Sequence, residues 1–405
     1  MVDVRAVITS WFIMLKQDIY VLIRIESLVA LVTVMFLVMF ILDIFHCQSG
    51  KSSMTTIMKI VDGVSDQIVV YLIGAMQSAN FTNHLFPVWA IVLVSFRASL
   101  GYLSGYSIVD RERRITEVSN VIKFIGTGVL NGTRALEFTK PLWLLWAILT
   151  LRSIYKFLVH GAAIKSLWHG RSSEFIPQHL HVGYNNEHQG RQSGADDSIK
   201  KMYLVYGEAN VNIRINKPGY NLYLDVPNEN SLITLDKIHE TTYKDMSLAF
   251  ALSRLLRCRF EDVPLHTESI TMTRKLTISD IIGNNREKPD AAFRILELEL
   301  AFVRDYFYTL YPMVFWKGLF SLLLSLLQSF ATFAVTFWLA LAIIKVYKPK
   351  KDNFVIWVHG CNVDVVSTWV FLFFMMIKEV WEMVTYLVSN WTRLLLVCRY
   401  VRSQS

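Results

Sequence analysis

Long runs of apolar residues dominate the pattern of this chain. Leu28–Phe45 holds a single charged residue, Asp43, and is preceded by Arg24 and Glu26, and Leu319–Ile344 holds no charged residue. An α-helix needs about 20 mostly apolar residues to cross the hydrocarbon core of a bilayer. We therefore predict about seven membrane-spanning helices: Leu28–Phe45, Ile57–Met76, Leu85–Leu103, Val118–Thr133, Leu142–Val159, Leu319–Ile344 and Asp364–Val388. Val118–Thr133 is short and rich in glycine, and whether it crosses the membrane stays open.

The middle of the chain has a different pattern. Val211–Ile215 and Tyr220–Val226 alternate apolar and polar residues on either side of a Lys-Pro-Gly turn, which predicts a β-hairpin. Ser247–Phe260 and Asp290–Leu310 carry apolar residues at helical spacing. These patterns predict a small α+β domain that is soluble.

Together the patterns predict a mainly α fold, a multi-pass α-helical membrane protein with a small inserted α+β soluble domain. The predicted order is an N-terminal segment lying in the membrane interface (1–27), a bundle of about five spans (28–159), the soluble domain (160–310), a hairpin of two spans (311–392) and a basic tail (393–405).

Composition supports this membrane assignment. Of 405 residues, 53% are hydrophobic and 18% are charged, with a mean hydropathy of +0.36, whereas soluble domains are about 25% charged. The net charge is +8, yet residues 160–309 hold 18 basic and 19 acidic residues. The whole excess therefore lies with the apolar runs, where Lys and Arg anchor helices at lipid headgroups. This distribution predicts contact with a lipid bilayer and argues against nucleic-acid binding.

The orientation in the membrane is left open by conflicting signals. An external N-terminus would place the sequons at Asn80 and Asn131 in the lumen, where both are candidate glycosylation sites. The four lysines that follow Ile344 would then face the wrong side for the positive-inside rule. Plasma membrane and endomembrane are equally compatible with these signals, and the oligomeric state is not indicated.

Charged residues inside the predicted spans are the sharpest chemical feature. Lys59, Asp62 and Asp66 share one stripe of the second span, and Arg97 lies near the middle of the third. Because these spans are neighbours in the sequence, Arg97 can pair with either aspartate.

The last span repeats this theme with Lys378, Glu379 and Glu382, while Arg152 and Lys156 supply positive charge in the fifth. Charges in the bilayer are costly, so they usually face protein or water and have partners. The candidate intramembrane polar network comprises Asp62, Asp66, Arg97, Glu379 and Glu382. It is either a path for ions or protons, with Asp66 and Glu379 as its central acids, or a set of structural pairs between helices.

Two small-residue motifs, Gly101-x-x-x-Gly105 and Gly128-x-x-x-Gly132, allow helices to approach closely. We interpret both as packing seams within the chain rather than as dimer interfaces.

The candidate catalytic and metal-binding motifs in the sequence are incomplete. Gly50-Lys51-Ser52 lacks the glycine and the strand that a P-loop requires, and His239-Glu240 lacks the second histidine of a zinc-binding HExxH motif. No Walker, GxSxG or GxGxxG pattern occurs. The sequence thus predicts no enzyme activity, no cofactor and no metal site.

Several blocks, read in order, carry a family resemblance. They include MYLVYGEAN, LITLDKIHE, LAFALSRLLRCRF, AFRILELELAFVRDYFYT and VDVVSTWVFLFFMMIKEVWEMV. The order resembles the plant multi-pass membrane family called domain of unknown function 4220, typical of grasses, and Asp364, Glu379 and Trp391 match family positions. In the block VWAIVLVSFRASLGYLSGYSIVDRERR, Gly101 stands where the family has an aspartate, so that acid's role does not carry over.

The resemblance implies an integral membrane protein of plants and no established activity. Many members continue into a module called domain of unknown function 594, which we do not expect in this chain. Our leading hypothesis is a non-enzymatic membrane component that acts through partner or lipid contacts of the soluble domain. The alternative is a transporter or channel that uses the intramembrane acids.

Overall fold

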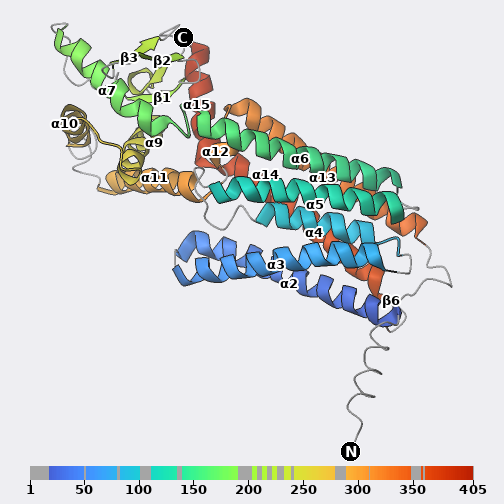
Figure 1. Ribbon diagram of the computed structural model, residues 1–405. Helices are drawn as coiled ribbons and strands as arrows, with labels where there is room; N and C mark the ends of the chain where they lie inside the picture. Colours follow the sequence, from blue (N-terminus) through green and yellow to red (C-terminus); the bar gives the residue numbers. More distant parts are fainter. Residues whose placement is uncertain are drawn as a thin grey trace, which may run out of the picture. The chain divides into compact units, whose positions relative to one another are not determined.

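A computed structural model shows a chain built almost wholly of helices, in two compact units (Figure 1). Unit 1 comprises the described residues of 1–106, 110–158 and 324–384, and unit 2 those of 159–323 and 385–405. The structure describes residues 18–49, 52–79, 83–100, 111–134, 139–189, 203–207, 212–216, 221–225, 232–238, 241–278, 289–309, 311–347, 357–358 and 361–404.

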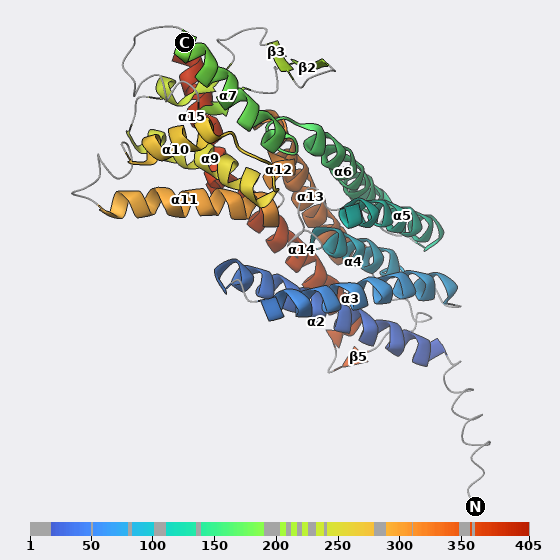
Figure 2. The ribbon, with the colours of Figure 1, turned by 60° about the vertical axis from the view of Figure 1, so that its left-hand side comes forward.

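Unit 1 is a bundle of long helices (Figure 2). Buried apolar side chains of these helices form one core. Three of these helices, α6, α13 and α14, also contribute residues to unit 2. Its elements are α2 (Asp18–Ser49), α3 (Ser52–Ser78), α4 (Phe86–Leu100), α5 (Arg111–Arg134), α6 (Thr139–Lys165), α13 (Leu319–Val346), the antiparallel pair β5 (Trp357–Val358) and β6 (Cys361–Asn362), and α14 (Val363–Val388).

Each predicted span coincides with one of these helices, but only part of the span prediction is confirmed. Among the described residues, three helices are long and apolar enough to cross a membrane: Tyr20–Leu42, Thr139–Lys165 and Leu319–Val346. The predicted span Leu85–Leu103 gives α4, which has 15 residues. Charged residues interrupt the apolar pattern of α3, α5 and α14. Length and composition therefore support three spans, and the number seven is not confirmed.

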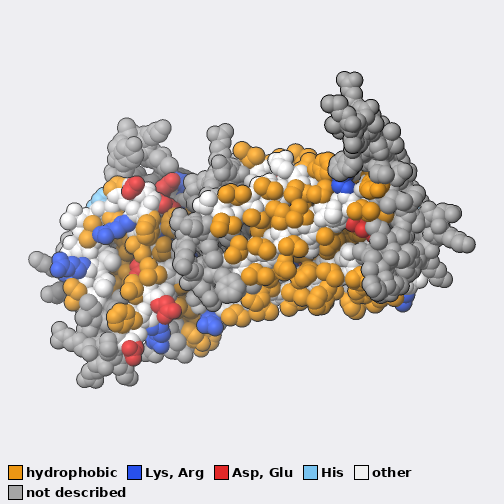
Figure 3. All heavy atoms as spheres, turned by 90° about the horizontal axis from the view of Figure 1, so that it is seen from below, with side chains coloured by type: hydrophobic (Ala, Val, Ile, Leu, Met, Phe, Trp, Pro, Cys, Tyr) orange, Lys and Arg blue, Asp and Glu red, His pale blue; other side chains and the backbone are white. Residues whose placement is uncertain are grey.

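The charge-bearing helices α3, α5 and α14 expose hydrophobic side chains and bury polar ones. On α5, Ile115, Ile122 and Ile125 are 56–65% exposed, whereas Asn120 and Lys123 are buried. Hydrophobic side chains likewise cover much of the face of unit 1 drawn in Figure 3. The polar side of such a helix faces its neighbours and its apolar side faces outward, opposite to the arrangement in a water-soluble bundle.

Helix α4 runs beside α14 in the same direction. The indole Nε1 of Trp89 donates a hydrogen bond of 2.7 Å to Thr368 Oγ1, and its ring meets the Phe371 ring edge-on. Before α4 begins, Asn83 Nδ2 donates to Asp364 Oδ2 at 3.3 Å. These contacts fix the register of two helices that lie far apart in the sequence.

A glycine allows α5 and α6 to touch. A Cβ added at Gly128 would lie 2.9 Å from the Trp146 ring, which is held by a 2.8 Å hydrogen bond from Nε1 to Phe124 O. Gly132 faces Trp143 with more room, at 3.9 Å. The seam at residues 128–132 therefore packs within the chain, while Gly101 and Gly105 lie outside the described residues.

Unit 2 combines helices with short strand pairs. The predicted hairpin is confirmed as an antiparallel pair in which Asn212 faces Asp225, but helices provide most of the unit, and a separate α+β domain is not confirmed. Its elements are α7 (Ser172–Gln189), β1 (Leu204–Tyr206), β2 (Asn212–Asn216), β3 (Asn221–Asp225), β4 (Ile233–Thr234), η3 (Leu235–Lys237), α9 (Thr241–Phe260), α10 (Thr267–Leu276), α11 (Pro289–Tyr308), α12 (Tyr311–Val314) and α15 (Asn390–Gln404).

An aromatic cluster around Trp391 of α15 forms part of the core of unit 2. The Trp391 ring is stacked on Phe315, with an interplanar angle of 9°, and meets Phe250 and Phe302 edge-on. Trp168 approaches it at 5.8 Å between ring centroids. A residue near the C-terminal end of the chain thus joins α9, α11 and the segment after α6.

We expect Gly128→Ala to destabilise the protein by about 1–3 kcal/mol, because the added methyl group overpacks the contact with Trp146. The matched control is Gly74→Ala in α3, where nothing lies within 4 Å of the added Cβ. Alanine there should be neutral or stabilise by up to about 1 kcal/mol, because it favours the helix. Thermal unfolding of both variants in detergent measures the difference, and equal melting midpoints would contradict this packing.

Candidate functional site: paired charges inside the helical bundle

Arg97 of α4 joins α3 and α5 in a first ion-pair cluster, formed by Asp62, Asp66, Arg97 and Lys123. Its guanidinium contacts both carboxylate oxygens of Asp62, at 2.5 and 3.0 Å, and its Nε donates to Asp66 Oδ1 at 2.8 Å. The Lys123 ammonium of α5 donates to the same Asp66 oxygen. Two cations and two carboxylates therefore balance within one buried group.

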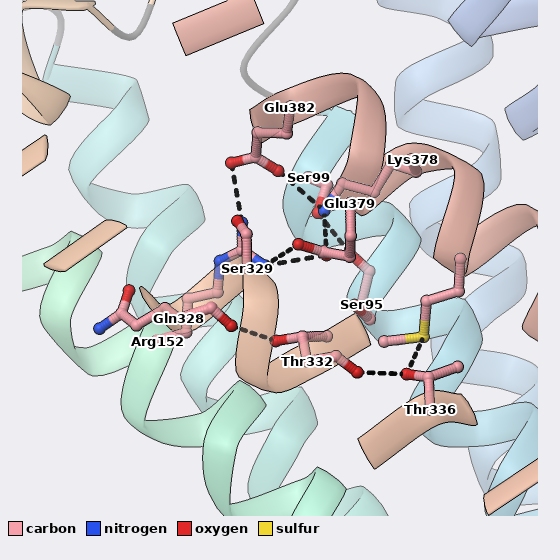
Figure 4. Close-up of polar contacts among 11 residues, drawn as sticks. Ser95, Ser99, Arg152, Gln328, Ser329, Thr332, Thr336, Lys378, Glu379 and Glu382 are labelled. Atoms are coloured by element: carbon pink, nitrogen blue, oxygen red, sulfur yellow. Dashed lines mark hydrogen bonds and ion pairs between the residues drawn. The ribbon is translucent and has the colours of Figure 1, made fainter. Parts of the chain in front are cut away.

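Arg152 of α6 organises a second ion-pair cluster with Lys378, Glu379 and Glu382 of α14 (Figure 4). Its Nη1 binds both oxygens of Glu379, at 2.9 and 2.8 Å, and its Nη2 donates to Glu382 at 2.8 Å. Nη2 also reaches Ser329 Oγ of α13 at 3.2 Å. One arginine thus holds three helices through its planar set of donors.

Lysines complete the charge balance of the second cluster. Lys378 Nζ lies 2.7 Å from Glu379 Oε1 and 3.1 Å from Glu382 Oε2. Lys156 of α6 interacts electrostatically with Glu382 and with Glu117 of α5. Within the cluster, Arg152 and Lys378 thus balance Glu379 and Glu382. Glu379 is fully buried, a position that an ionised carboxylate tolerates only when it is paired.

The five residues that the sequence singled out therefore fall into two separate groups. Asp62, Asp66 and Arg97 belong to the first cluster, and both of the aspartate–arginine pairs considered from the sequence form. Glu379 and Glu382 belong to the second cluster. Figure 4 shows Ser95 and Ser99 of α4 beside the second cluster; they lie on the opposite side of that helix from Arg97.

Comparison with known protein families identifies the family of this chain. The family model described as Domain of unknown function (DUF4220) matches residues 60–405, which include every residue of both clusters. The chain belongs to the DUF4220 family. No curated protein and no solved structure matches it.

Sequence reasoning missed part of this site in the DUF4220 chain. Lys123 supplies half of the positive charge of the first cluster, and its signal was that it is the single charged residue within Val118–Thr133. Glu117 lies just before that predicted span, where it resembles a headgroup anchor. The side chain of Lys59 lies outside the described residues.

The two candidate glycosylation sites have different outcomes. Asn80 lies outside the described residues. Asn131 sits inside α5 with 1% of its surface exposed, so a glycan does not fit in this packing. Among the residues that the structure describes, no group of three or more His, Cys, Asp or Glu gathers to hold a metal ion; the absence of metals and cofactors stays a prediction.

Two titratable groups near Trp391 in unit 2 respond to pH in opposite directions. Burial lowers the pKa of His169 to about 3 from 6.5, so the unfolded chain binds the extra proton and stability falls on acidification through that range. Burial raises the pKa of Asp305 to about 6 from 3.8, although Arg304 opposes the shift. Here the folded chain binds the extra proton, so stability falls as pH rises from 3.8 to 6.

Removal of Arg152 tests the second cluster. Arg152→Met leaves two buried glutamates with fewer counter-charges and should cost about 3–5 kcal/mol, as expected for breaking a buried ion pair. Arg171→Met is the matched control, because the Arg171–Glu174 pair is exposed and should contribute at most about 1 kcal/mol. Chemical unfolding of the purified protein compares them; an Arg152 variant as stable as the control would refute the assignment.

Asp305→Asn should remove the stability loss on the alkaline side. The variant is expected to exceed the wild type in stability above pH 6, by up to about 3 kcal/mol for a shift of about two pKa units. Below pH 3.8 the two proteins should be equally stable, because Asp305 is then protonated in both folded and unfolded states. Melting curves recorded across this range measure the effect, and a constant difference at every pH would speak against it.

Proposed function

We propose that this DUF4220 protein is a multi-pass integral membrane protein of non-enzymatic function, in which the paired charges hold the helices together. It acts through partner or lipid contacts made by unit 2. The observation that carries the proposal is the complete pairing of all five candidate charged residues within unit 1.

The membrane assignment is supported by the outward faces of the helices. Beyond the three long apolar helices, α3, α5 and α14 also present large hydrophobic side chains at their surfaces, including Ile60, Ile122 and Phe373. In lipid, such faces need no cover, and a polar inner face is satisfied by neighbouring helices. We therefore propose that charged helices of unit 1 also span the bilayer.

The structural role of the charges is favoured over transport by their arrangement. A carrier acid must release one partner and take up an ion during each cycle. Asp66 is bound by two cations at once, and Glu379 is enclosed by Arg152 and Lys378. Balanced groups of this kind provide adhesion between helices without a free charge to move. The alternative, a transporter or channel that uses these acids, would need both groups to open.

Contacts of unit 2 with a partner or with lipid are supported by an apolar stripe on α11. Phe293, Leu296 and Leu300 follow helical spacing and are 47–69% exposed. The opposite face of α11 is buried through Ile295 and Phe302. Since its core contacts are already made, the outer stripe is available for association. The non-enzymatic part of the proposal rests on the lack of catalytic motifs in the sequence.

A double-mutant cycle on Asp66 and Lys123 tests the structural role. Asp66→Asn should lower the melting midpoint and the folded yield, because it leaves the Lys123 ammonium buried without its counter-charge. Adding Lys123→Met removes that orphaned charge and should restore at least half of the loss. Fluorescence-detected size exclusion after heating measures both quantities.

Reconstituted vesicles supply the opposing test. With a pH-sensitive dye inside, wild-type and Asp66→Asn proteoliposomes should leak protons at the same background rate as protein-free vesicles. A wild-type proton or cation flux that Asp66→Asn abolishes without lowering the melting midpoint would overturn the structural proposal in favour of transport.

A further inference from the structure

A third buried polar contact in unit 1 has no cation. The carboxyl groups of Glu26 in α2 and Asp364 in α14 lie within hydrogen-bonding reach of each other. Asp364 is fully buried. Its Oδ1 and Glu26 Oε1 are both enclosed, and neither accepts a hydrogen bond from a donor among the described residues. This pair therefore differs in kind from the two ion-pair clusters.

The neighbours of the pair are neutral. Asn83 Nδ2 donates to Asp364 Oδ2 at 3.3 Å, and Asn83 Oδ1 is already occupied by Leu85 N at 2.9 Å, which fixes the direction of the amide. Asn362 Oδ1 accepts the Asp364 backbone N–H at 3.0 Å and so caps α14. Asp364 Oδ2 thus accepts a hydrogen bond from an amide, whereas Oδ1 accepts none from the described residues.

The titratable groups of the surrounding elements make no ion pair with either acid. Arg24, two residues before Glu26 in α2, lies over the Tyr71 ring of α3, with its guanidinium carbon 5.8 Å from the ring centroid. His84 follows Asn83 and is buried, and it makes interactions of its own. No Lys or Arg among the described residues forms a salt bridge with Glu26 or Asp364.

Two carboxylates in contact, one of them fully buried, strongly disfavour double ionisation, because burial leaves their repulsion poorly screened. One proton resolves the conflict: the protonated acid donates a hydrogen bond to the other, and the pair carries a single negative charge. The N-terminus of α14, where Asp364 stands, favours that remaining charge. We propose that Glu26 and Asp364 form a proton-binding site that joins α2 to α14 through one shared proton.

The site adds a pH-sensitive joint to the bundle, beyond the adhesive role of the two clusters. While the proton is bound, a hydrogen bond links two helices that are remote in the sequence. When the proton leaves, two like charges face each other, and the contact between α2 and the start of α14 is driven open. The proposed ligand is a proton, because the two acids lack only a hydrogen-bond donor between them. A metal ion such as calcium would need about six or more oxygen ligands around it.

Infrared spectroscopy of the purified full-length protein tests the proposal. The wild type at neutral pH should show the carbonyl stretching band of a protonated, buried carboxylic acid, shifted by exchange into heavy water. Glu26→Gln and Asp364→Asn should each remove that band. Glu174→Gln, which alters an exposed carboxylate, is the control and should keep it. The proposal fails if the wild type lacks such a band, or if both variants retain it.

Stability measurements give an independent outcome. Either amide variant supplies a permanent N–H donor in place of the proton, so both should fold. Their melting midpoints should stay level over the alkaline range in which the wild-type midpoint falls. Sodium or calcium ions should leave the wild-type midpoint unchanged. If an added cation raises that midpoint and either substitution abolishes the effect, the pair is a cation site and the shared proton is refuted.

Discussion

Every charge buried between helices with apolar outer faces must find its counter-charge on a neighbouring helix, and unit 1 is arranged around that requirement. Burying an isolated ionised group in such surroundings costs roughly several kcal/mol of free energy. Arg97 draws α3 and α4 together, and Lys123 adds α5. Arg152 does the same for α6, α13 and α14. Both central residues are arginines, because a guanidinium can bind two carboxylates at once.

The two units differ in the side chains that they bury and in those that they expose. Unit 1 encloses its ion-pair clusters among buried apolar side chains and also presents many hydrophobic side chains at its surface, whereas unit 2 buries an aromatic cluster around Trp391. Unit 2 also buries charged groups of its own: Arg257 lies 3.6 Å from the centroid of the Tyr306 ring and binds Glu261. The exposed stripe on α11 fits the proposed association of unit 2 with other molecules, and the apolar surface of unit 1 fits the proposed contact with lipid.

The contact between Glu26 and Asp364 follows the same rule by another route. Where no cation is within reach, a proton supplies the missing donor and halves the charge. At the start of α14, Asn362 accepts the Asp364 backbone N–H and caps the helix, and Asn83, which precedes α4, binds one oxygen of Asp364. Loss of one proton breaks this contact and its return restores it. The arginine pairs lack this property, because the guanidinium does not titrate.

The sequence by itself determined the long helices of unit 1, helices α9 and α11, the hairpin and the candidate charges of this protein. Apolar periodicity is a local property, so seven apolar stretches became seven helices, and alternation gave β2 and β3. The i, i+3 and i+7 spacing of Lys59, Asp62 and Asp66 likewise placed the two aspartates on one face of their helix.

Tertiary structure alone decided which charges meet. The sequence could not separate Glu26 from a headgroup anchor or recognise Lys123 as a partner, because burial depends on helices remote in the chain. Of the seven predicted spans, three are supported by length and composition among the described residues; the other four contain charged residues, whose partners only the assembled bundle supplies. Pairing is a property of the assembled bundle, where desolvation makes every unmatched charge costly.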